Sequence, residues 1–138
     1  MFRLKKIIGG RINQAEPEKI DTVASNAYSY GQALTKGTGG GYVKCTDDSK
    51  PEYISLETYT APASGNRQIL AYRILPGMIF EVEITGKVST VKQGTRLEFG
   101  TDGLDACAAE TVSTTGHIFV ADKNGATAEN DTVLVTIE

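Results

Sequence analysis

The longest strand-like stretch of the sequence runs from Gln68 to Thr85, and its hydrophobic positions alternate with polar ones in the second half. Side chains along a strand point to opposite faces in turn, so residues two apart share a face. The apolar series of this half is Met78, Phe80, Val82 and Ile84. Glu81 and Glu83 fall on the opposite face, which predicts a half-buried strand.

The first half of the stretch is apolar on both faces, which predicts a strand covered on both sides by other strands or by a neighbouring subunit. Pro76-Gly77 divides the two halves, and this pair is typical of a type II turn or a sharp corner. The predicted core residues are Leu70, Tyr72, Ile74, Phe80, Val82 and Ile84.

Short strand-like segments follow one another along the rest of the chain. They cover residues 19–25, 32–36, 42–46, 52–58, 87–91, 96–100, 104–111, 117–122 and 132–138. Asp102-Gly103 and Asn124-Gly125 are hairpin-type turn signals. No segment has a convincing helical period. About ten short strands joined by frequent turns predict an all-β fold, either a small β-barrel or a β-sandwich.

Residues 1–17 differ from this pattern and are predicted to form an N-terminal arm on a single β domain of residues 18–138. The first 15 residues carry four basic side chains and no acidic one, whereas the other ten basic and 17 acidic residues give the remainder a net charge of −7. Gly9-Gly10 interrupts any regular element. We expect the arm to order on a partner surface or a neighbouring subunit through Phe2, Arg3, Leu4, Lys5, Lys6, Ile7, Ile8 and Arg11.

Composition excludes several function classes. A net charge of −3 for 138 residues gives no reason to expect direct nucleic-acid binding, and no apolar run has the length of a membrane span or a signal peptide. The two cysteines, Cys45 and Cys107, are expected to be free thiols, since two cysteines do not make a disulfide framework. With His117 as the single histidine, no metal site is expected either.

Candidate catalytic groups have simpler structural interpretations. His117 opens an apolar strand, and neither Ser113 nor Cys107 stands at a spacing that supports a nucleophile–base pair. A phosphate-binding loop needs a Lys-Ser/Thr pair after its last glycine, but Gly41 precedes a strand, so residues 37–41 are predicted to be a hairpin loop. We therefore expect no enzyme activity, no catalytic residue and no cofactor.

Several strand and turn patterns resemble those of small head decoration (cement) proteins of tailed bacteriophages. They are Gly31-Gln32-Ala33-Leu34, Val43-Lys44-Cys45, Lys50-Pro51-Glu52-Tyr53-Ile54-Ser55, Leu75 to Val82, Asp102-Gly103 and Asp131 to Val135. The resemblance covers residues 31–138. It implies a non-enzymatic protein made in the bacterial cytoplasm and found on the capsid exterior of the virion. It also implies a homotrimer that binds the major capsid protein, with no membrane partner.

Two alternatives were weighed. A small β-sandwich binding module, such as a glycan-binding or adhesion domain of a phage tail or cell surface, would present a row of exposed aromatic side chains. The six tyrosines could supply such a row, although the chain has no tryptophan. A trimeric nucleotide hydrolase of the deoxyuridine-triphosphatase type is also all-β, but its uracil motif and its glycine-rich C-terminal phosphate arm are missing.

Overall fold

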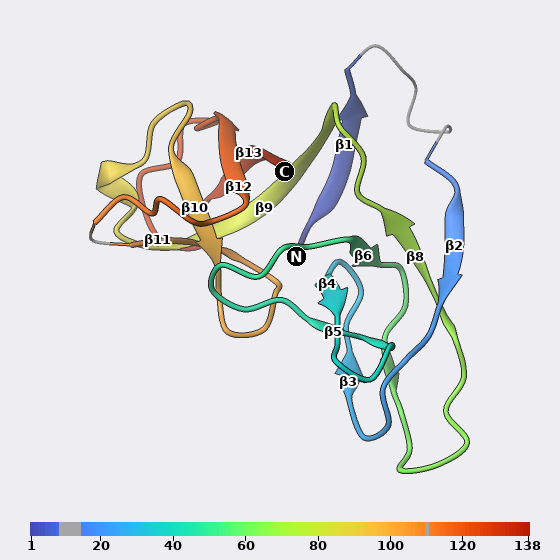
Figure 1. The fold of residues 1–138 in the computed structure, drawn as a ribbon. Coiled ribbons are helices and arrows are strands. Elements are labelled where there is room, and N and C mark those ends of the chain that lie inside the picture. The colour runs from blue at the N-terminus through green and yellow to red at the C-terminus, as the bar shows by residue number, and fades with distance from the viewer. Residues whose placement is uncertain (9–14, 110) are drawn as a thin grey trace.

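A computed structural model describes residues 1–8, 15–109 and 111–138 as an almost entirely β structure (Figure 1). Within these residues a short 3-10 helix, η2 (Val88–Thr90), accompanies the strands. The strands are β1 (Arg3–Ile7), β2 (Pro17–Ile20), β3 (Ala27–Tyr28), β4 (Ala33–Lys36), β5 (Tyr42–Lys44), β6 (Tyr53–Ser55), β7 (Tyr59–Thr60), β8 (Ile69–Arg73), β9 (Met78–Gly86), β10 (Arg96–Phe99), β11 (Ala106–Ala108), β12 (Ile118–Asp122) and β13 (Thr132–Ile137).

Five strands close into a small barrel in the order β9-β11-β10-β12-β13, because β13 pairs back onto β9. All these pairings are antiparallel except β9 with β11, which is parallel. The nine-residue strand β9 also carries β1 as an antiparallel neighbour outside the barrel. The barrel prediction is therefore confirmed, and the most clearly alternating segment of the sequence is its longest strand.

The other strands form a second layer beside the barrel. An antiparallel sheet has the order β2-β8-β6-β4-β5, and β3 and β7 form a separate two-stranded ribbon. In Figure 1 this sheet lies to the right of the barrel, and β2 and β8 run along its outer side. The chain therefore crosses between the two layers at the β8–β9 turn and between β1 and β2.

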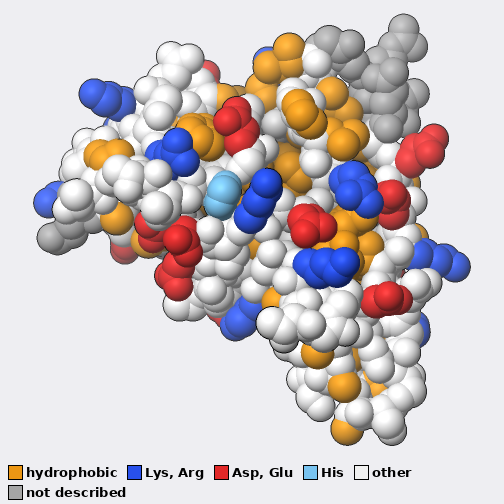
Figure 2. All heavy atoms as spheres, in the orientation of Figure 1, with side chains coloured by type: hydrophobic (Ala, Val, Ile, Leu, Met, Phe, Trp, Pro, Cys, Tyr) orange, Lys and Arg blue, Asp and Glu red, His pale blue; other side chains and the backbone are white. Residues whose placement is uncertain are grey.

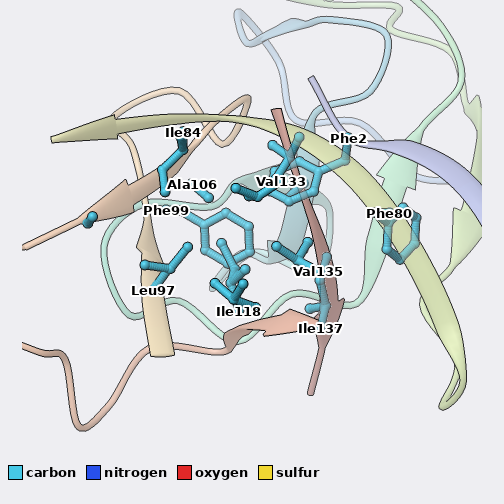
Figure 3. Close-up of a cluster of buried hydrophobic side chains, with 14 of the residues drawn as sticks. Phe2, Phe80, Ile84, Leu97, Phe99, Ala106, Ile118, Val133, Val135 and Ile137 are labelled. Carbon is cyan, nitrogen blue, oxygen red and sulfur yellow. The ribbon is translucent and has the colours of Figure 1, made fainter. Parts of the chain in front are cut away.

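Two hydrophobic clusters stabilise these layers. The larger cluster fills the barrel and extends to the sheet face that carries Ala33 and Ile54 (Figure 3). Its fully buried large side chains include Phe2, Phe80, Phe99, Leu97, Ile84 and Ile118. The smaller cluster lies on the opposite sheet face, where Leu34, Tyr53 and Ile69 pack with Tyr28 of the ribbon. Both faces of the sheet are thus partly buried.

The β10–β11 turn joins the layers through Gly103, which has a φ of +66°. The Gly103 carbonyl accepts a 2.7 Å hydrogen bond from the Ala33 N–H of β4. A Cβ atom at Gly103 would lie 2.8 Å from the Ala33 oxygen and 3.0 Å from the Cys45 oxygen. Glycine is needed here both for the left-handed backbone and for the close approach. The predicted Asp102-Gly103 turn therefore also serves as a packing contact.

The core prediction is confirmed on β9 and partly wrong on β8. Phe80, Val82 and Ile84 are all buried. On β8 the buried residues are Ile69 and Ala71, whereas Leu70 is 38% exposed. Tyr72 and Ile74 are only partly buried against the barrel cluster. The reason is that the barrel covers just one end of that sheet face, so Leu70 extends beyond it.

One predicted strand and part of the predicted arm need correction. Residues 87–91 contain the 3-10 helix η2 rather than a strand, with Val88 and Val91 buried and Ser89 exposed between them. Residues 1–8 do not form a free arm, because they contain β1, which is paired with β9. Alternation did not indicate this strand, because Arg3, Lys5 and Lys6 point to solvent from a strand that pairs on one side only. Residues 9–14, including Arg11, lie outside the described residues.

Candidate functional site

The predicted attachment segment contributes directly to the core through Phe2. This side chain is 1% exposed and contacts Phe80 and Phe99, with ring centroids 6.4 and 5.6 Å away. The Phe2 N–H donates a 2.9 Å hydrogen bond to the Gly31 carbonyl, next to the five-stranded sheet. Phe2 therefore joins the two layers, and its burial leaves it no surface for a partner. Leu4 and Ile7 are half-buried against the same cluster.

The exposed residues of this segment are Arg3, Lys5, Lys6 and Ile8. Lys5 Nζ lies 3.6 Å from Glu81 Oε2 on β9, and the Met1 amino group forms an ion pair with Glu83. Burial is the largest single influence and would raise the pKa of Glu83. The hydrogen bond from the Met1 amino group, a backbone hydrogen bond and the positive charges of Met1 and Arg3 together outweigh it, so the pKa is lowered. Glu81 and Glu83, on the polar face of β9, therefore balance positive charges of the N-terminal segment.

The free edge of β1 is poorly suited to pairing with another strand. The register with β9 shifts between Leu4 and Lys6, as in a β-bulge, and three basic side chains decorate the strand. Bulges and lysines are the features that protect edge strands against unwanted pairing. A partner is thus more compatible with the side chains of this region than with its backbone.

An apolar groove opens where the end of β1 meets the β8–β9 turn and the end of β13. This "tip groove" has a volume of about 500 Å³. Its lining residues are Ile8, Lys50, Pro51, Ile74, Leu75, Pro76, Gly77, Thr136, Ile137 and Glu138. Ile8 is 65% exposed and Leu75 is 44% exposed. Figure 2 shows hydrophobic side chains gathered at this end of the molecule.

Hydrogen bonds hold the walls of the tip groove in place. The Ile8 N–H donates 2.7 Å to the Gly77 carbonyl, and the Leu75 N–H donates 3.4 Å to the Met78 sulfur. The groove is therefore preformed, which suits a binding surface because little ordering entropy remains to be lost on association. The sequence analysis named Ile8, but it placed Leu75 in the strand-like stretch and Pro76-Gly77 in a turn, without assigning either to a binding surface. The signal that it missed is a leucine immediately before a turn.

The tyrosines do not form an exposed row. Tyr28 and Tyr53 are buried, and only Tyr30 is largely exposed at 48%. The other three, Tyr42, Tyr59 and Tyr72, are half-buried. The guanidinium of Arg73 lies 4.8 Å from the Tyr53 ring and that of Arg67 lies 4.3 Å from the Tyr59 ring, so cations cover two of the rings. The flat aromatic platform of a sugar-binding surface is not present in this arrangement.

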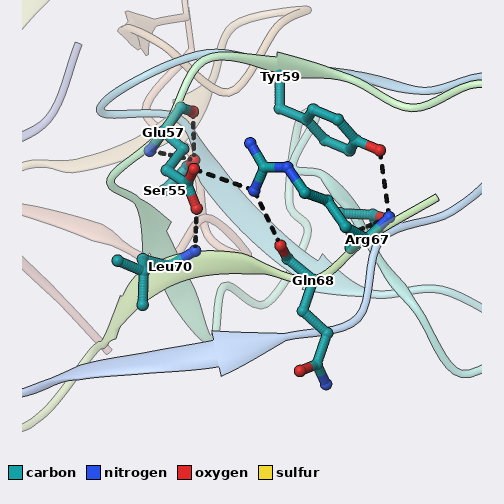
Figure 4. Close-up of polar contacts among 7 residues, drawn as sticks. Ser55, Glu57, Tyr59, Arg67, Gln68 and Leu70 are labelled. Atoms are coloured by element: carbon teal, nitrogen blue, oxygen red, sulfur yellow. Dashed lines mark hydrogen bonds and ion pairs between the residues drawn. The ribbon is translucent and has the colours of Figure 1, made fainter.

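A cluster of polar contacts lies where the β6–β8 ladder ends (Figure 4). Glu57 Oε2 accepts a 2.6 Å hydrogen bond from the Leu70 N–H, and Glu57 Oε1 lies 3.1 Å from Arg67. The Leu70 N–H bond is the main cause of a lowered pKa for Glu57, although partial burial opposes it, and Arg67 adds to it. The Glu57 side chain replaces a strand carbonyl where the β6–β8 ladder ends, which is a structural role.

The catalytic candidates lie in separate structural contacts. His117 Nδ1 is 2.6 Å from the Glu138 backbone oxygen, whereas the Ser113 hydroxyl donates 2.7 Å to Glu98. Cys45 is buried, and burial followed by the nearby Glu52 carboxylate raises the pKa of its thiol to about 12. Cys107 is half-buried and is also a free thiol. No hydrogen bond among the described residues connects His117, Ser113 and Cys107 to each other.

Within residues 1–8, 15–109 and 111–138, no three His, Cys, Asp or Glu side chains gather closely enough to hold a metal ion. No helix in that part of the chain combines the length and the apolarity of a membrane span.

Comparison with known proteins gives a likeness of fold. Neither the protein-family models nor the curated protein sequences gave a match. Among solved structures, the chain is similar to the head fiber gp8.5 N base of bacteriophage phi29, with a TM-score of 0.57 and 15% sequence identity. The alignment covers 89% of this chain and 95% of that one. The two proteins thus share most of a fold at low sequence identity.

Proposed function

We propose that this chain is a structural protein of a tailed-bacteriophage head. In this proposal it binds the major capsid protein on the outer surface of the shell as a homotrimer and braces the shell against internal pressure. The observation that carries the proposal is the fold likeness to a phage head fiber base, which extends over 89% of this chain at a TM-score of 0.57. The resemblance of residues 31–138 to head decoration proteins points to the same class independently of that likeness.

A non-catalytic role is part of this proposal. The polar side chains that could have formed an active site are engaged in structural contacts: Glu83 with Met1, Ser113 with Glu98, and His117 with the chain end. The exposed residues of the N-terminal segment, Arg3, Lys5, Lys6 and Ile8, remain candidates for contact with the capsid, whereas buried Phe2 does not.

The name of the similar structure favours a second, narrower candidate, the base of a fiber on the head. The glycan-binding alternative is less well supported, because five of the six tyrosines are at least half-buried, and two of these five, Tyr28 and Tyr53, are buried in the core. A fiber base and a decoration protein would both attach to the shell, but only the fiber base would carry a fiber.

Co-sedimentation with head shells of the source phage tests the proposal. We expect the purified chain to pellet with shells at a saturable stoichiometry and to raise the temperature at which the shells break. Electron microscopy of the decorated shells would then distinguish a flat cap from a fiber base. A chain that stays in the supernatant at every shell concentration would overturn the proposed attachment.

A further inference from the structure

The two glycine turns predicted from the sequence, Asp102-Gly103 and Asn124-Gly125, differ in what surrounds them. Glycine has no side chain to shield its backbone nitrogen, so that nitrogen can approach the side-chain carbonyl of the preceding residue closely. When it attacks that carbonyl carbon, the aspartate or asparagine closes into a succinimide ring. Each pair is therefore a potential site of backbone rearrangement, and the surrounding structure decides whether the ring can form.

The Asp102-Gly103 pair is held by several contacts. Gly103 is buried, and its N–H donates a 3.3 Å hydrogen bond to the Gly100 carbonyl. The Asp102 carboxylate lies 2.9 Å from Lys44 Nζ, and the Asp102 backbone carbonyl accepts a 2.6 Å hydrogen bond from the Gln32 side chain. Turning this peptide toward the carboxylate would break contacts between the two layers, so the fold protects the pair from ring closure.

The Asn124-Gly125 pair is held by its turn alone. Both residues are exposed, and no described atom beyond the chain neighbours lies within 4 Å of the Gly125 Cβ position. The turn is closed by a 3.0 Å hydrogen bond from the Ala126 N–H to the Lys123 carbonyl, and the Asn124 N–H donates 2.8 Å to Asp122. Among the described residues, the Asn124 side chain and the Gly125 N–H have no hydrogen-bond partner. The two groups that would react are therefore not engaged elsewhere.

The other described asparagines are less suited to this reaction. Asn26 and Asn66 donate their side-chain N–H groups to backbone carbonyls, at 3.3 Å and 2.9 Å respectively, and neither precedes a glycine. Asn130 is exposed and has a φ of +70°, close to the +53° of Asn124, but an aspartate follows it. Asn130 is therefore an internal control, which shares its residue type, exposure and backbone conformation with Asn124 but not the glycine.

We propose that Asn124 is a modification site, at which the side chain loses its amide nitrogen through a succinimide formed with Gly125. A bond forms between the Gly125 nitrogen and Asn124 Cγ, the bond from Cγ to Nδ2 breaks, and Nδ2 leaves as ammonia with the proton from the Gly125 N–H. Water then opens the ring. Breaking the bond from the Gly125 nitrogen to Cγ yields aspartate, whereas breaking its bond to the backbone carbonyl carbon yields isoaspartate. Water is the co-reactant, and no electron transfer is involved.

The isoaspartate product would strain the connection between β12 and β13. In isoaspartate the main chain runs through the former side chain, which lengthens it by one atom inside the turn closed by Lys123 and Ala126. Ala126 is 2% exposed and belongs to the barrel cluster, so it cannot move freely to accommodate that atom. We expect the modified chain to melt about 2–5 °C lower, the effect of losing roughly one net hydrogen bond.

Incubation of the full chain in mildly alkaline water enriched in heavy oxygen tests this site. Each succinimide that hydrolyses takes one oxygen atom from the solvent, and peptide mapping by mass spectrometry after digestion in ordinary water locates that atom. In the folded chain we expect label at position 124, with at least about tenfold less at Asn130. Label at Asp102 should be at least about tenfold lower in the folded chain than in denaturant, because ring closure there requires the fold to open.

A substitution separates the added charge from the added backbone atom. Asn124→Asp introduces the carboxylate without lengthening the main chain, so it should melt within about 2 °C of the unmodified chain. The isoaspartate fraction, separated by chromatography, should melt lower than this variant. Equal melting temperatures would overturn the strain assigned to the β12–β13 connection.

The modification itself is overturned if the folded chain gains no label at position 124 over a time in which the denatured chain does. It is also overturned if Asn130 is labelled as fast as Asn124, because the following glycine would then not matter. This inference goes beyond the proposed function and does not depend on it. Attachment to the head is decided separately, by co-sedimentation of the unmodified chain with shells.

Discussion

Phe2 illustrates how a residue expected to contact a partner becomes part of the core. Its ring is enclosed by Phe80 and Phe99, and its backbone N–H is bonded to Gly31. A Cβ atom at Gly31 would lie 2.7 Å from the Met1 Cβ and 3.1 Å from the Phe2 oxygen, so the second layer closes tightly over this position. Both layers therefore bury the Phe2 ring, and both contribute to the stabilisation that its burial provides.

Phe2→Ala should consequently lower the free energy of unfolding by about 3–5 kcal/mol, the usual cost of removing a buried aromatic ring. Chemical denaturation of the purified chain measures this change. Ile8→Ala is the control, because Ile8 is 65% exposed and should cost about 0.5 kcal/mol or less. A loss of under about 1 kcal/mol for Phe2→Ala would contradict the burial described.

Glu57 gives a pH-dependent contribution to stability. The pKa of its carboxylate is lowered in the folded chain, chiefly by the Leu70 N–H bond. A lowered pKa means that the contribution is complete above the unfolded value of about 4.3 and is lost as the pH falls through the folded value. Glu57→Gln keeps an acceptor oxygen but cannot titrate. We expect the melting temperature of this variant to fall less steeply below about pH 4.5 than that of the unmodified chain. If the two chains lost melting temperature equally in acid, Glu57 would not have this role.

The two thiols should differ in reactivity. Burial raises the pKa of Cys45 to about 12, and the thiolate is the reactive form, whereas Cys107 is half-buried. In the folded chain, a thiol reagent at pH 8 should label Cys107 much faster than Cys45. In denaturant without reductant both should react, giving two thiols per chain. A count of zero in denaturant would reveal a disulfide and contradict the structure.

At the scale of elements, the β10–β11 turn depends on Gly103, whose Cβ position is occupied by backbone atoms of β4 and Cys45. Gly94 provides a matched comparison, since its φ is +83° but no atom lies within 4 Å of its Cβ position. Gly94→Ala should cost about 1–2 kcal/mol from backbone conformation alone. Gly103→Ala should cost clearly more, because β4 must also shift. Equal costs in thermal unfolding would show that the close approach does not matter.

Strands with a clear alternation, such as β9 and β13, could be predicted from the sequence together with their buried faces. β11 and its pairing with β10 followed from the Asp102-Gly103 turn. The predictions that were wrong, for Leu70 and for residues 87–91, depended on tertiary context. Leu70 has a core-like residue type and spacing, but no layer covers it. Alternation also cannot show that residues 87–91 pack Val88 and Val91 through a helical turn.

The candidate site was less predictable than the fold, because it is assembled from distant parts of the chain. Ile8, Lys50, Leu75 and Ile137 meet at the tip groove although they belong to four separate segments. Each has an ordinary local role as a strand end, a turn residue or a core residue. Only the paths of β1, β9 and β13 bring them together, and those paths are set by long-range pairing that short sequence windows do not contain.

For the whole molecule, β1 connects the barrel to the second layer, since it pairs with β9 and places Phe2 against Gly31. Deleting residues 1–8 removes this strand and opens the barrel cluster. The loss of Phe2 alone is worth about 3–5 kcal/mol, and each kcal/mol lowers the melting temperature of a domain of this size by about 3–5 °C. We expect the truncated chain to melt at least about 10 °C lower or to be recovered unfolded.

A peptide of residues 1–8 added in trans should partly restore the melting temperature, because it can occupy the vacant edge of β9 as an added strand. The same peptide with Phe2→Ala should restore much less, since Phe2 is the one fully buried side chain of residues 1–8. Lys5→Ala and Lys6→Ala together keep β1 in place and should change the melting temperature by about 2 °C or less. If the truncated chain instead melted at the same temperature as the full chain, the contacts of β1 with the core would not contribute to folding. β1 would then be a dispensable attachment arm.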